Sequence, residues 1–374
     1  MKKSRVHLRF SVSTDQFGSQ PQSWSRRQWI RNVSVASAAA AVGPGIVRLA
    51  HAAKNSEVVM SMSGGSYMEN WQKKIIDPFQ KETGISVKMV PGSFHAHAMR
   101  VRASRRGAPP FDLLMGDGFD FINLIAGGYL LPLPANKVPN LAEVAPKFRD
   151  QFNDHAVLFD YASLGIAYST ARVKNPPKSW REFVDRTAAG DFGNRVFCNN
   201  LPAGVRGPEF LMLFDRVFGK DDKDVDAGFA AFKRMKPHVF KFFTTFSDPV
   251  QLITNGEGDI GPGWDGRTYI AHDAGEKIDW IAPTEGVGAA GPTVGVVKGG
   301  NSDAAYALLN YSIGAVAQKA FCEAMGYGAV NAKVVYSERL AKRVPSVQNA
   351  IVADNRFISE HLREWVERWN REIL

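Results

Sequence analysis

Two arginines carry the side chains best suited to bind a charged small molecule. Arg206 precedes the start of an expected helix in a glycine-rich loop, and Arg267 follows Trp264 by three residues. A guanidinium group binds a carboxylate or a phosphonate through two parallel hydrogen bonds. The sequence therefore offers a site for an acidic group at either arginine, although a surface ion pair explains each of them equally well.

Two expected strand-to-helix loops hold further candidates. The Ser66 hydroxyl and the backbone N–H groups beside it could donate to an anion at a helix start, or the neighbouring glycines could simply form a turn. Asp117 could face a ligand, but capping the helix that follows is the favoured interpretation. The acids that could meet an amine are Glu209, Asp248 and Asp265.

The patterns of several enzyme and metal-binding classes do not occur. The sequence has no haem motif, no set of iron–sulfur cysteines, no nucleotide loop and no G-x-S-x-G turn, so we expect no enzyme and no cofactor. Cys198 and Cys322 lack the spacing of a metal or redox motif, and whether they pair stays open. His95 and His97 form an H-x-H pair, which fits polar residues at a helix start better than a metal site.

The N-terminal segment has the features of an export signal. Arg26 and Arg27 are followed by a mildly apolar segment that runs to Ala50, and residues 50–52 fit a small-residue cleavage site. The apolar part is short and is interrupted by glycine and proline, unlike a membrane-spanning helix. We therefore predict that residues 1–52 are a twin-arginine signal peptide and that the mature protein is periplasmic.

Removal of the signal peptide changes what the charge implies. The chain of 374 residues has 46 Lys and Arg, 37 Asp and Glu and a net charge of +9. Residues 1–52 hold eight of the basic residues and one acid, which leaves 38 basic and 36 acidic residues and a net charge of +2. A nearly neutral protein lacks the electrostatic surface that nucleic acid requires. We expect no nucleic-acid partner, and contact with a membrane only by peripheral docking.

The elements that must position these residues alternate between strand-like and helix-like segments. The expected strands are 57–62, 85–90, 111–115, 195–198, 259–263, 278–282 and 293–297, and the main expected helices are 67–81, 208–218, 224–236 and 359–374. Alternation with glycines at the turns predicts an α/β fold with a largely parallel sheet. Ligands of such sheets bind beyond the carboxyl ends of the strands.

Several motifs in a fixed order resemble extracellular solute-binding proteins. They are KETGI at 81–85, FDLLM at 111–115 and GGYLLPL at 127–133. NGEGDIG at 255–261 running on to Trp264, PTEG at 283–286 and GYGAVN at 326–331 look like the spermidine/putrescine-binding branch, which also covers binders of other small amines and amino acids. The resemblance spans nearly all of residues 56–345.

The resemblance implies a two-lobe periplasmic-binding-protein fold of the α/β class, with mixed sheets and a hinge of crossing strands. Lobe 1 would comprise 56–160 plus 290–335, and lobe 2 would comprise 165–285 plus 336–374. The lobes would close on a small-molecule solute and deliver it to the permease subunits of an ABC importer. A periplasmic sensor subunit and a ferric-ion or other metal receptor are the alternatives. We expect a monomer.

In that branch the ligand contacts loops of both lobes, and Trp264 matches an aromatic platform for an alkyl chain. The candidate ligand-binding residues are Gly65, Ser66, Tyr67, Asp117, Phe119, Tyr161, Arg206, Trp264, Asp265, Arg267 and Thr293.

The stretch GAAGPTV at 288–294 departs from the polyamine binders, which carry an aromatic residue and a carboxylate on this crossing strand. A dication buried without carboxylate partners would cost several kcal/mol per charge. Small residues on this wall, with Arg206 and Arg267, favour a ligand that has an acidic group. We expect an amino acid, an organic acid or an aminophosphonate, with a polyamine as the less favoured option.

Overall fold

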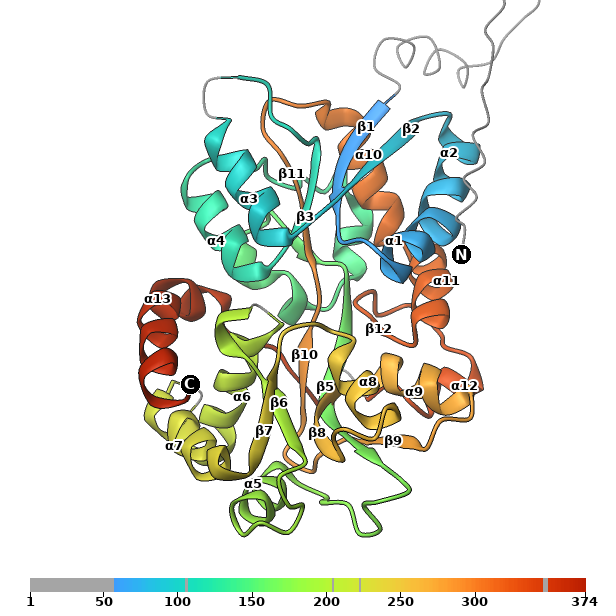
Figure 1. Cartoon of the computed structure of the whole chain (residues 1–374). Coiled ribbons are helices and arrows are strands. Elements are labelled where there is room, and N and C mark those ends of the chain that lie inside the picture. The colour runs from blue at the N-terminus through green and yellow to red at the C-terminus, as the bar shows by residue number, and fades with distance from the viewer. Residues whose placement is uncertain (1–56, 105–106, 204, 222, 346–348) are drawn as a thin grey trace, which may run out of the picture. The chain divides into compact units, whose positions relative to one another are not determined.

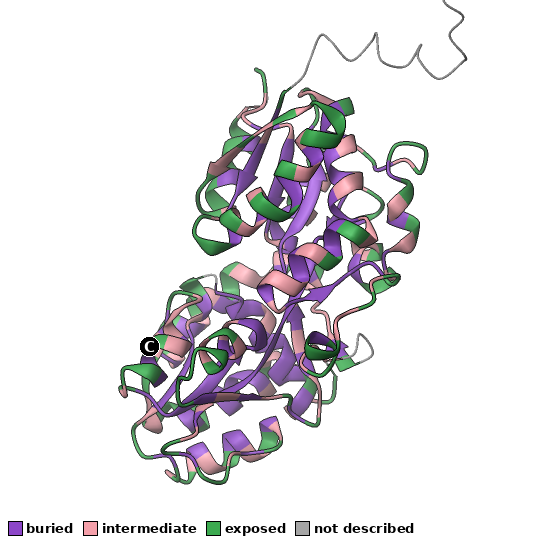
Figure 2. Ribbon diagram, turned by 90° about the vertical axis from the view of Figure 1, so that its right-hand side faces the viewer, coloured by how far each residue is buried: buried purple, intermediate pink, exposed green. Residues whose placement is uncertain are grey.

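The computed structural model describes residues 57–104, 107–203, 205–221, 223–345 and 349–374 (Figure 1). The predicted signal peptide lies outside the described residues. Within the described part, two mixed β-sheets form the framework, and their strands are largely buried (Figure 2). The predicted α/β class with mixed sheets is confirmed, but the largely parallel sheet expected from the alternation of elements is wrong, because antiparallel pairs occur in both sheets and predominate in the second.

The first sheet has five strands in the order β2-β1-β3-β11-β4. β1 pairs in parallel with β2 and with β3, whereas β11 runs antiparallel to β3 and to β4. The strands are β1 (Glu57–Met62), β2 (Ser86–Pro91), β3 (Leu113–Gly116), β4 (Val157–Leu158) and β11 (Thr293–Val296). We call this sheet, with the helices packed on it, lobe 1.

The second sheet is built around a long strand, β5, which pairs antiparallel with β8 and β10. Its path is β13-β10-β5-β8-β6-β7, and β9 and β12 also pair with β5. The strands are β5 (Asp160–Ser169), β6 (Val196–Asn199), β7 (Val239–Phe243), β8 (Ile260–Trp264), β9 (Ile278–Ile281), β10 (Val287–Ala290), β12 (Gly328–Ala329) and β13 (Ala350–Ile351). We call this sheet, with its helices, lobe 2.

The chain crosses between the sheets at two adjacent places. One crossing is Phe159, between β4 and β5, and the other is Gly291 and Pro292, between β10 and β11. The Phe159 N–H donates to the Pro292 carbonyl at 2.8 Å, so the two crossings are joined. A Cβ on Gly291 would lie 1.8 Å from the Asp160 carbonyl oxygen, so only glycine permits this approach.

Helices lie on both sides of the first sheet (Figure 1). α3 and α4 lie on one side, and α1, α2, α10 and α11 lie on the other. A π-helix (Gln72–Ile76) joins α1 to α2, so the predicted helix at 67–81 is continuous. The bounds are α1 (Ser66–Trp71), α2 (Asp77–Thr83), α3 (Phe94–Ala103), α4 (Gly118–Ala126), α10 (Ser302–Ser312) and α11 (Ala315–Met325).

Helices also flank the second sheet, with α6, α7 and α13 on one side and α8 and α9 on the other (Figure 1). In α6, Pro208 stands in the first turn and Phe210 and Phe214 are fully buried, as the apolar periodicity predicts. The bounds are α5 (Trp180–Ala188), α6 (Gly207–Phe218), α7 (Val225–Met235), α8 (Asp248–Thr254), α9 (Asp265–Asp273), α12 (Glu338–Ala341) and α13 (Asn355–Glu372). Within the described residues, 3₁₀ turns also occur at 139–143, 146–148, 150–152, 201–203 and 236–238.

The last helix, α13, begins four residues before the predicted start at residue 359. The Asp354 side chain accepts hydrogen bonds from the N–H groups of Arg356 and Phe357, which stabilises the earlier start. α13 contacts both lobes: the Asn355 N–H donates to Gln151 Oε1 of lobe 1 at 3.0 Å, and the Trp369 ring packs edge-on against lobe 2.

Cys198 in β6 and Cys322 in α11 are free and fully buried, one in each lobe. Among the described helices, none combines the length and the apolar character needed to cross a membrane.

Candidate functional site

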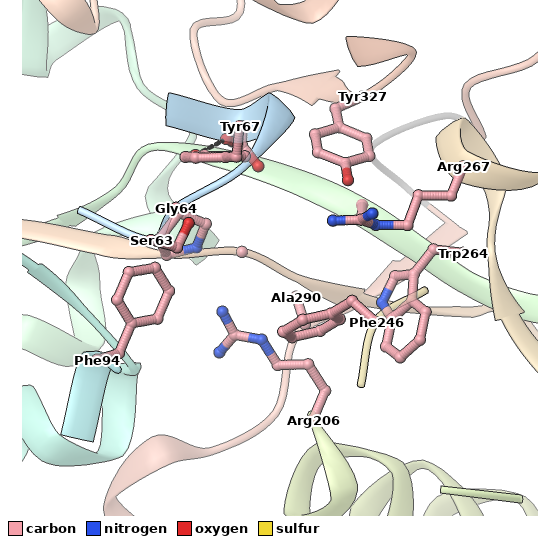
Figure 3. A pocket seen from close by; sticks show the side chains of 14 residues that line it. Ser63, Gly64, Tyr67, Phe94, Arg206, Phe246, Trp264, Arg267, Ala290 and Tyr327 are labelled. Atoms are coloured by element: carbon pink, nitrogen blue, oxygen red, sulfur yellow. Dashed lines mark hydrogen bonds between the residues drawn. The ribbon is translucent and has the colours of Figure 1, made fainter. Parts of the chain in front are cut away.

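A cavity of about 160 Å³ opens where residues of both lobes and both crossings converge (Figure 3). Lobe 1 contributes the end of β1, the start of α1 and the start of α3, while lobe 2 contributes the residue before α6, the loop before α8 and the β8–α9 junction. The lining residues are Ser63, Gly64, Tyr67, Phe94, Asp160, Ala162, Arg206, Phe246, Trp264, Arg267, Ala290, Gly291, Pro292 and Tyr327.

Arg206 is buried at the start of α6, with 5% of its surface exposed. One of its guanidinium nitrogens lies 2.9 Å from Asp117 Oδ1 of lobe 1, and the same nitrogen lies 3.1 Å from Glu209 Oε1. The pair with Asp117 therefore joins the two lobes. Both simpler interpretations from the sequence are wrong: Arg206 is not a surface residue, and Asp117 holds the N-cap position of α4 without making a side-chain cap.

Burial raises the pKa of the Asp117 carboxyl to about 6, although Arg206 opposes this shift. Glu209 and Asp120 add to the increase because they are negative. The positive charge of Arg206 is thus balanced by the carboxyl groups of Asp117 and Glu209.

Arg267, on α9, also lines the cavity, and its guanidinium group points into it close to the Tyr327 hydroxyl (Figure 3). The guanidinium carbon lies 5.9 Å from the centre of the Phe246 ring. Among the described residues, no carboxylate forms an ion pair with Arg267. This cation is therefore free to bind an acidic group from outside the protein.

Trp264, the last residue of β8, is 3% exposed and forms part of an aromatic wall. Its ring meets the Phe246 ring edge-on, with centroids 5.0 Å apart, and the Phe243 ring at 5.9 Å. The apolar packing holds the indole in one orientation beside the cavity.

Asp160, the first residue of β5, is the acid of the cavity and is 1% exposed. Tyr67 donates its hydroxyl hydrogen to Asp160 Oδ2, whereas Oδ1 has no hydrogen-bond partner among the described residues. Burial raises the pKa of Asp160 to about 7, against the lowering effects of the Tyr67 hydrogen bond and of Arg206.

Four residues of the predicted set line this cavity: Tyr67, Arg206, Trp264 and Arg267. Asp117 and Phe119 lie beside it, in an adjoining groove of about 520 Å³ that shares Ser63, Phe94 and Phe246 with the cavity.

The other predicted residues do not line the cavity. Gly65 and Ser66 are exposed at the start of α1. Asp265 is buried and accepts hydrogen bonds from the N–H groups of Ser163 and Gly266. The remaining two are core residues: Tyr161 stacks on Phe148, and Thr293 is buried in β11 between two partner strands.

The sequence interpretation missed Asp160, Phe94, Phe246 and Tyr327. Asp160 had a usable signal, because it is an ionisable residue inside the apolar run 156–162, at the first expected crossing. The three aromatic residues had none, because each stands at the edge of a helix or in a loop that only the fold brings to the cavity.

The two histidines do not converge. His95 is 3.1 Å from Asp120 with its side chain largely exposed, while His97 is buried against Phe111. Across the described residues, no group of three or more His, Cys, Asp or Glu side chains could hold a metal ion.

Comparisons with known proteins agree on one class. The family model of bacterial extracellular solute-binding proteins matches residues 74–345. The spermidine/putrescine-binding periplasmic protein of Salmonella typhimurium is 22% identical over 322 residues, covering 82% of this chain and 85% of that protein. The thiamine-binding periplasmic protein of Brucella suis is 23% identical over 221 residues, covering 58% of this chain and 61% of that one.

A solved structure from Bordetella parapertussis, described as an extracellular solute-binding protein, superposes with a TM-score of 0.79. It is 46% identical to this chain, and the match covers 85% of this chain and 99% of that one.

Proposed function

The chain belongs to the bacterial extracellular solute-binding protein family, and from this premise we propose that it is a periplasmic receptor whose ligand carries an acidic group. The receptor holds the solute in the cavity between the lobes and delivers it to the permease subunits of an ABC importer. Its relatives are binding proteins rather than enzymes, and several are periplasmic.

The observation that carries the proposal is Arg267. It is a cation that lines the cavity, and it forms no ion pair with an acid of the described residues. A guanidinium in such a place binds a carboxylate or phosphonate through charge-assisted hydrogen bonds. Because the charge of Arg206 is already balanced by Asp117 and Glu209, Arg206 would support the acidic group rather than bind it alone.

The test is a binding screen on the mature protein, freed of bound solute by unfolding and refolding. A thermal-shift panel of amino acids, dicarboxylates, phosphonates and polyamines identifies a ligand, since ligand at 100 times its Kd adds about 2.7 kcal/mol of stability. We expect stabilisation by compounds that have an acidic group, and stabilisation by polyamines alone would contradict the proposal.

Replacing Arg267 tests the site directly. We expect Arg267→Gln to weaken the identified ligand by roughly 10- to 100-fold, because charge-assisted hydrogen bonds contribute about 1.5–3 kcal/mol. Isothermal titration calorimetry measures the change. Arg339→Gln is the matched control, because Arg339 is largely exposed and pairs with Asp273 outside the cavity. Equal affinities of the Arg267 variant and the wild type would show that the ligand binds elsewhere.

Export by the twin-arginine pathway is part of the same proposal. It is supported by Arg26 and Arg27, by the cleavage pattern at residues 50–52 and by the periplasmic relatives. Monomeric function is likewise proposed, because one chain supplies all the groups that line the cavity.

A further inference from the structure

Asp160 lies at one end of the cavity, and what it binds there rests on the proposed function of the same site. Asp160 is 1% exposed, and its Oδ1 atom has no hydrogen-bond partner among the described residues. Buried polar atoms in native proteins are nearly always hydrogen-bonded, because leaving one without a partner destabilises the folded protein. The unpaired oxygen therefore indicates a group that the protein itself does not supply.

Neither arginine that lines the cavity forms an ion pair with Asp160. Arg206 lies close enough to influence Asp160, but its ion pairs are with Asp117 and Glu209. Arg267 makes no ion pair among the described residues, with Asp160 or with any other acid. The cavity thus holds a carboxyl group with one oxygen that has no hydrogen-bond partner among the described residues and a guanidinium that forms no ion pair with them.

We propose that Asp160 and Tyr67 form a cation subsite that binds the ammonium group of the ligand, while Arg267 binds its acidic group. The ligand is then a short zwitterion of the amino-acid type. Asp160 Oδ1 accepts a hydrogen bond from the ammonium, and Tyr67 holds the carboxyl group in place through Oδ2. Each end of the ligand satisfies a group that is unpaired in the protein.

The walls between these ends suit a hydrocarbon linker. Trp264, Phe246 and Phe94 provide aromatic surface, and Ala290 and Pro292 provide a wall without hydrogen-bonding side chains. A cavity of 150 Å³ holds a molecule the size of benzene, so this cavity of about 160 Å³ fits roughly six to eight non-hydrogen atoms. The size corresponds to an amino acid of about four carbons.

The same arrangement selects against ligands with two like charges. A diamine would place its second ammonium beside Arg267, and a dicarboxylate would place its second carboxylate beside Asp160. Like charges at close range in a site of low dielectric are costly. The sequence interpretation found no acid on the second crossing strand, whereas the acid that lines the cavity is the first residue of β5, directly after the first crossing.

A matched set of four-carbon probes tests the proposal by calorimetry on the refolded mature protein. The probes are 4-aminobutanoate, 2-aminobutanoate, butanoate, butanedioate and 1,4-diaminobutane. We expect at least one amino acid to bind the wild type about tenfold or more tightly than butanoate, butanedioate and the diamine. Tighter binding of any of these three, or no binding of either amino acid at millimolar concentration, would overturn the inference.

Asp160→Asn removes the charge and keeps the shape. We expect it to weaken the preferred amino acid by about tenfold or more while leaving butanoate within about threefold of its wild-type affinity. Tyr67→Phe should weaken binding of the amino acid less than Asp160→Asn does, because it removes only the hydrogen bond that positions the Asp160 carboxyl group. Asp279→Asn on β9 is the control, since Asp279 does not line the cavity. The thermal midpoint of each ligand-free variant reports whether it has folded.

The two proposals fail in different ways. If Arg267→Gln abolishes binding and Asp160→Asn keeps the wild-type preference, Asp160 does not bind an ammonium and the proposed function stands. If neither variant changes the affinity, the cavity is not the site and both proposals are wrong.

Discussion

At the scale of single residues, Asp160 decides how the site responds to pH. Its carboxyl group is held at a raised pKa of about 7 by burial, so in the empty cavity it is largely protonated under mildly acidic conditions. An ammonium ligand needs the ionised form. Binding therefore requires that the proton leaves, and the cost of this step depends on pH.

We expect the affinity for a zwitterionic ligand to rise with pH and to level off above about 7. Below that value it should fall by up to about tenfold per pH unit, since the carboxyl must first lose its proton. Calorimetry at pH 5.5, 6.5, 7.5 and 8.5 measures the profile.

The charged or titratable groups facing Asp160 are Tyr67 on α1, Arg206 before α6, Asp265 on α9, and Cys322 and Tyr327 on or after α11.

Asp160→Asn provides the control for this profile. Asp117, with a pKa raised to about 6, titrates in a lower range and stays present in the variant. Asp265, whose pKa burial raises to about 7, also stays present, but Asp160 contributes to that increase, so the part of the slope that disappears in Asp160→Asn belongs to Asp160 together with its effect on Asp265. A wild-type affinity that is flat across the range, or a slope that the variant keeps, would contradict this role.

Individual site residues differ in how well the sequence predicted them. Tyr67 follows the end of β1, and its place at the edge of the sheet was readable from the alternation of elements, whereas Trp264 was indicated by the resemblance to solute-binding proteins and Arg267 by its spacing from Trp264. Asp265 was predicted as an acid that could meet an amine, yet its carboxylate accepts hydrogen bonds from the backbone N–H groups of Ser163 and Gly266. Periodicity places a residue near an edge but does not tell which way its side chain turns.

At the scale of elements, the start of α6 positions Arg206. The residue adopts a left-handed backbone conformation with φ of 57°, which is uncommon outside glycine. Gly207 follows, and a Cβ there would lie 2.4 Å from the Leu201 Cα in the adjacent 3₁₀ turn. The close contact between the turn and the helix start leaves Arg206 pointing into the cavity.

We expect Gly207→Ala to destabilise the protein by about 1–3 kcal/mol, because a backbone atom has to move to admit the methyl group. The same shift should displace Arg206 and weaken the ligand. Urea denaturation measures the stability. Gly107→Ala is the control, since a Cβ at Gly107 meets nothing within 4 Å and should leave the stability nearly unchanged. A Gly207 variant as stable as this control would show that the contact relaxes freely.

Element boundaries were the part of the fold least readable from sequence. The four main helices expected from the sequence are present, but α13 starts earlier because the Asp354 cap lies outside the apolar periodicity, and α5 was not predicted. α4 shows the reverse case: Asp117 has the type and position of a cap, yet an arginine from a distant segment takes its carboxylate. Local rules give way where a long-range ion pair competes for the same side chain.

At the scale of the whole molecule, the two lobes are joined by covalent crossings and by an ion pair. The pair between Arg206 and Asp117 connects the start of α6 in lobe 2 with the start of α4 in lobe 1. Both side chains are mostly buried, so the pair is less screened than one in solvent. It therefore helps to hold the lobes together beside the cavity.

The export proposal also belongs to this scale, since it concerns where the whole chain folds. We expect the double change Arg26→Lys and Arg27→Lys to leave uncleaved precursor in the cytoplasm, because both guanidinium groups form the twin-arginine signal. Cell fractionation and immunoblotting measure the distribution, and Lys2→Arg is a control that keeps the charge of the segment. Normal periplasmic accumulation of the double variant would point to another export route.

The two buried cysteines provide a way to measure the unfolding of each lobe separately. Cys322 in lobe 1 and Cys198 in lobe 2 are fully enclosed, and burial raises the pKa of both thiols, so neither reacts in the folded state. A thiol reagent can label each one only after its own lobe opens. Comparing the two labelling rates, with and without solute, would show whether the lobes unfold together or one at a time, with no probe added to the chain.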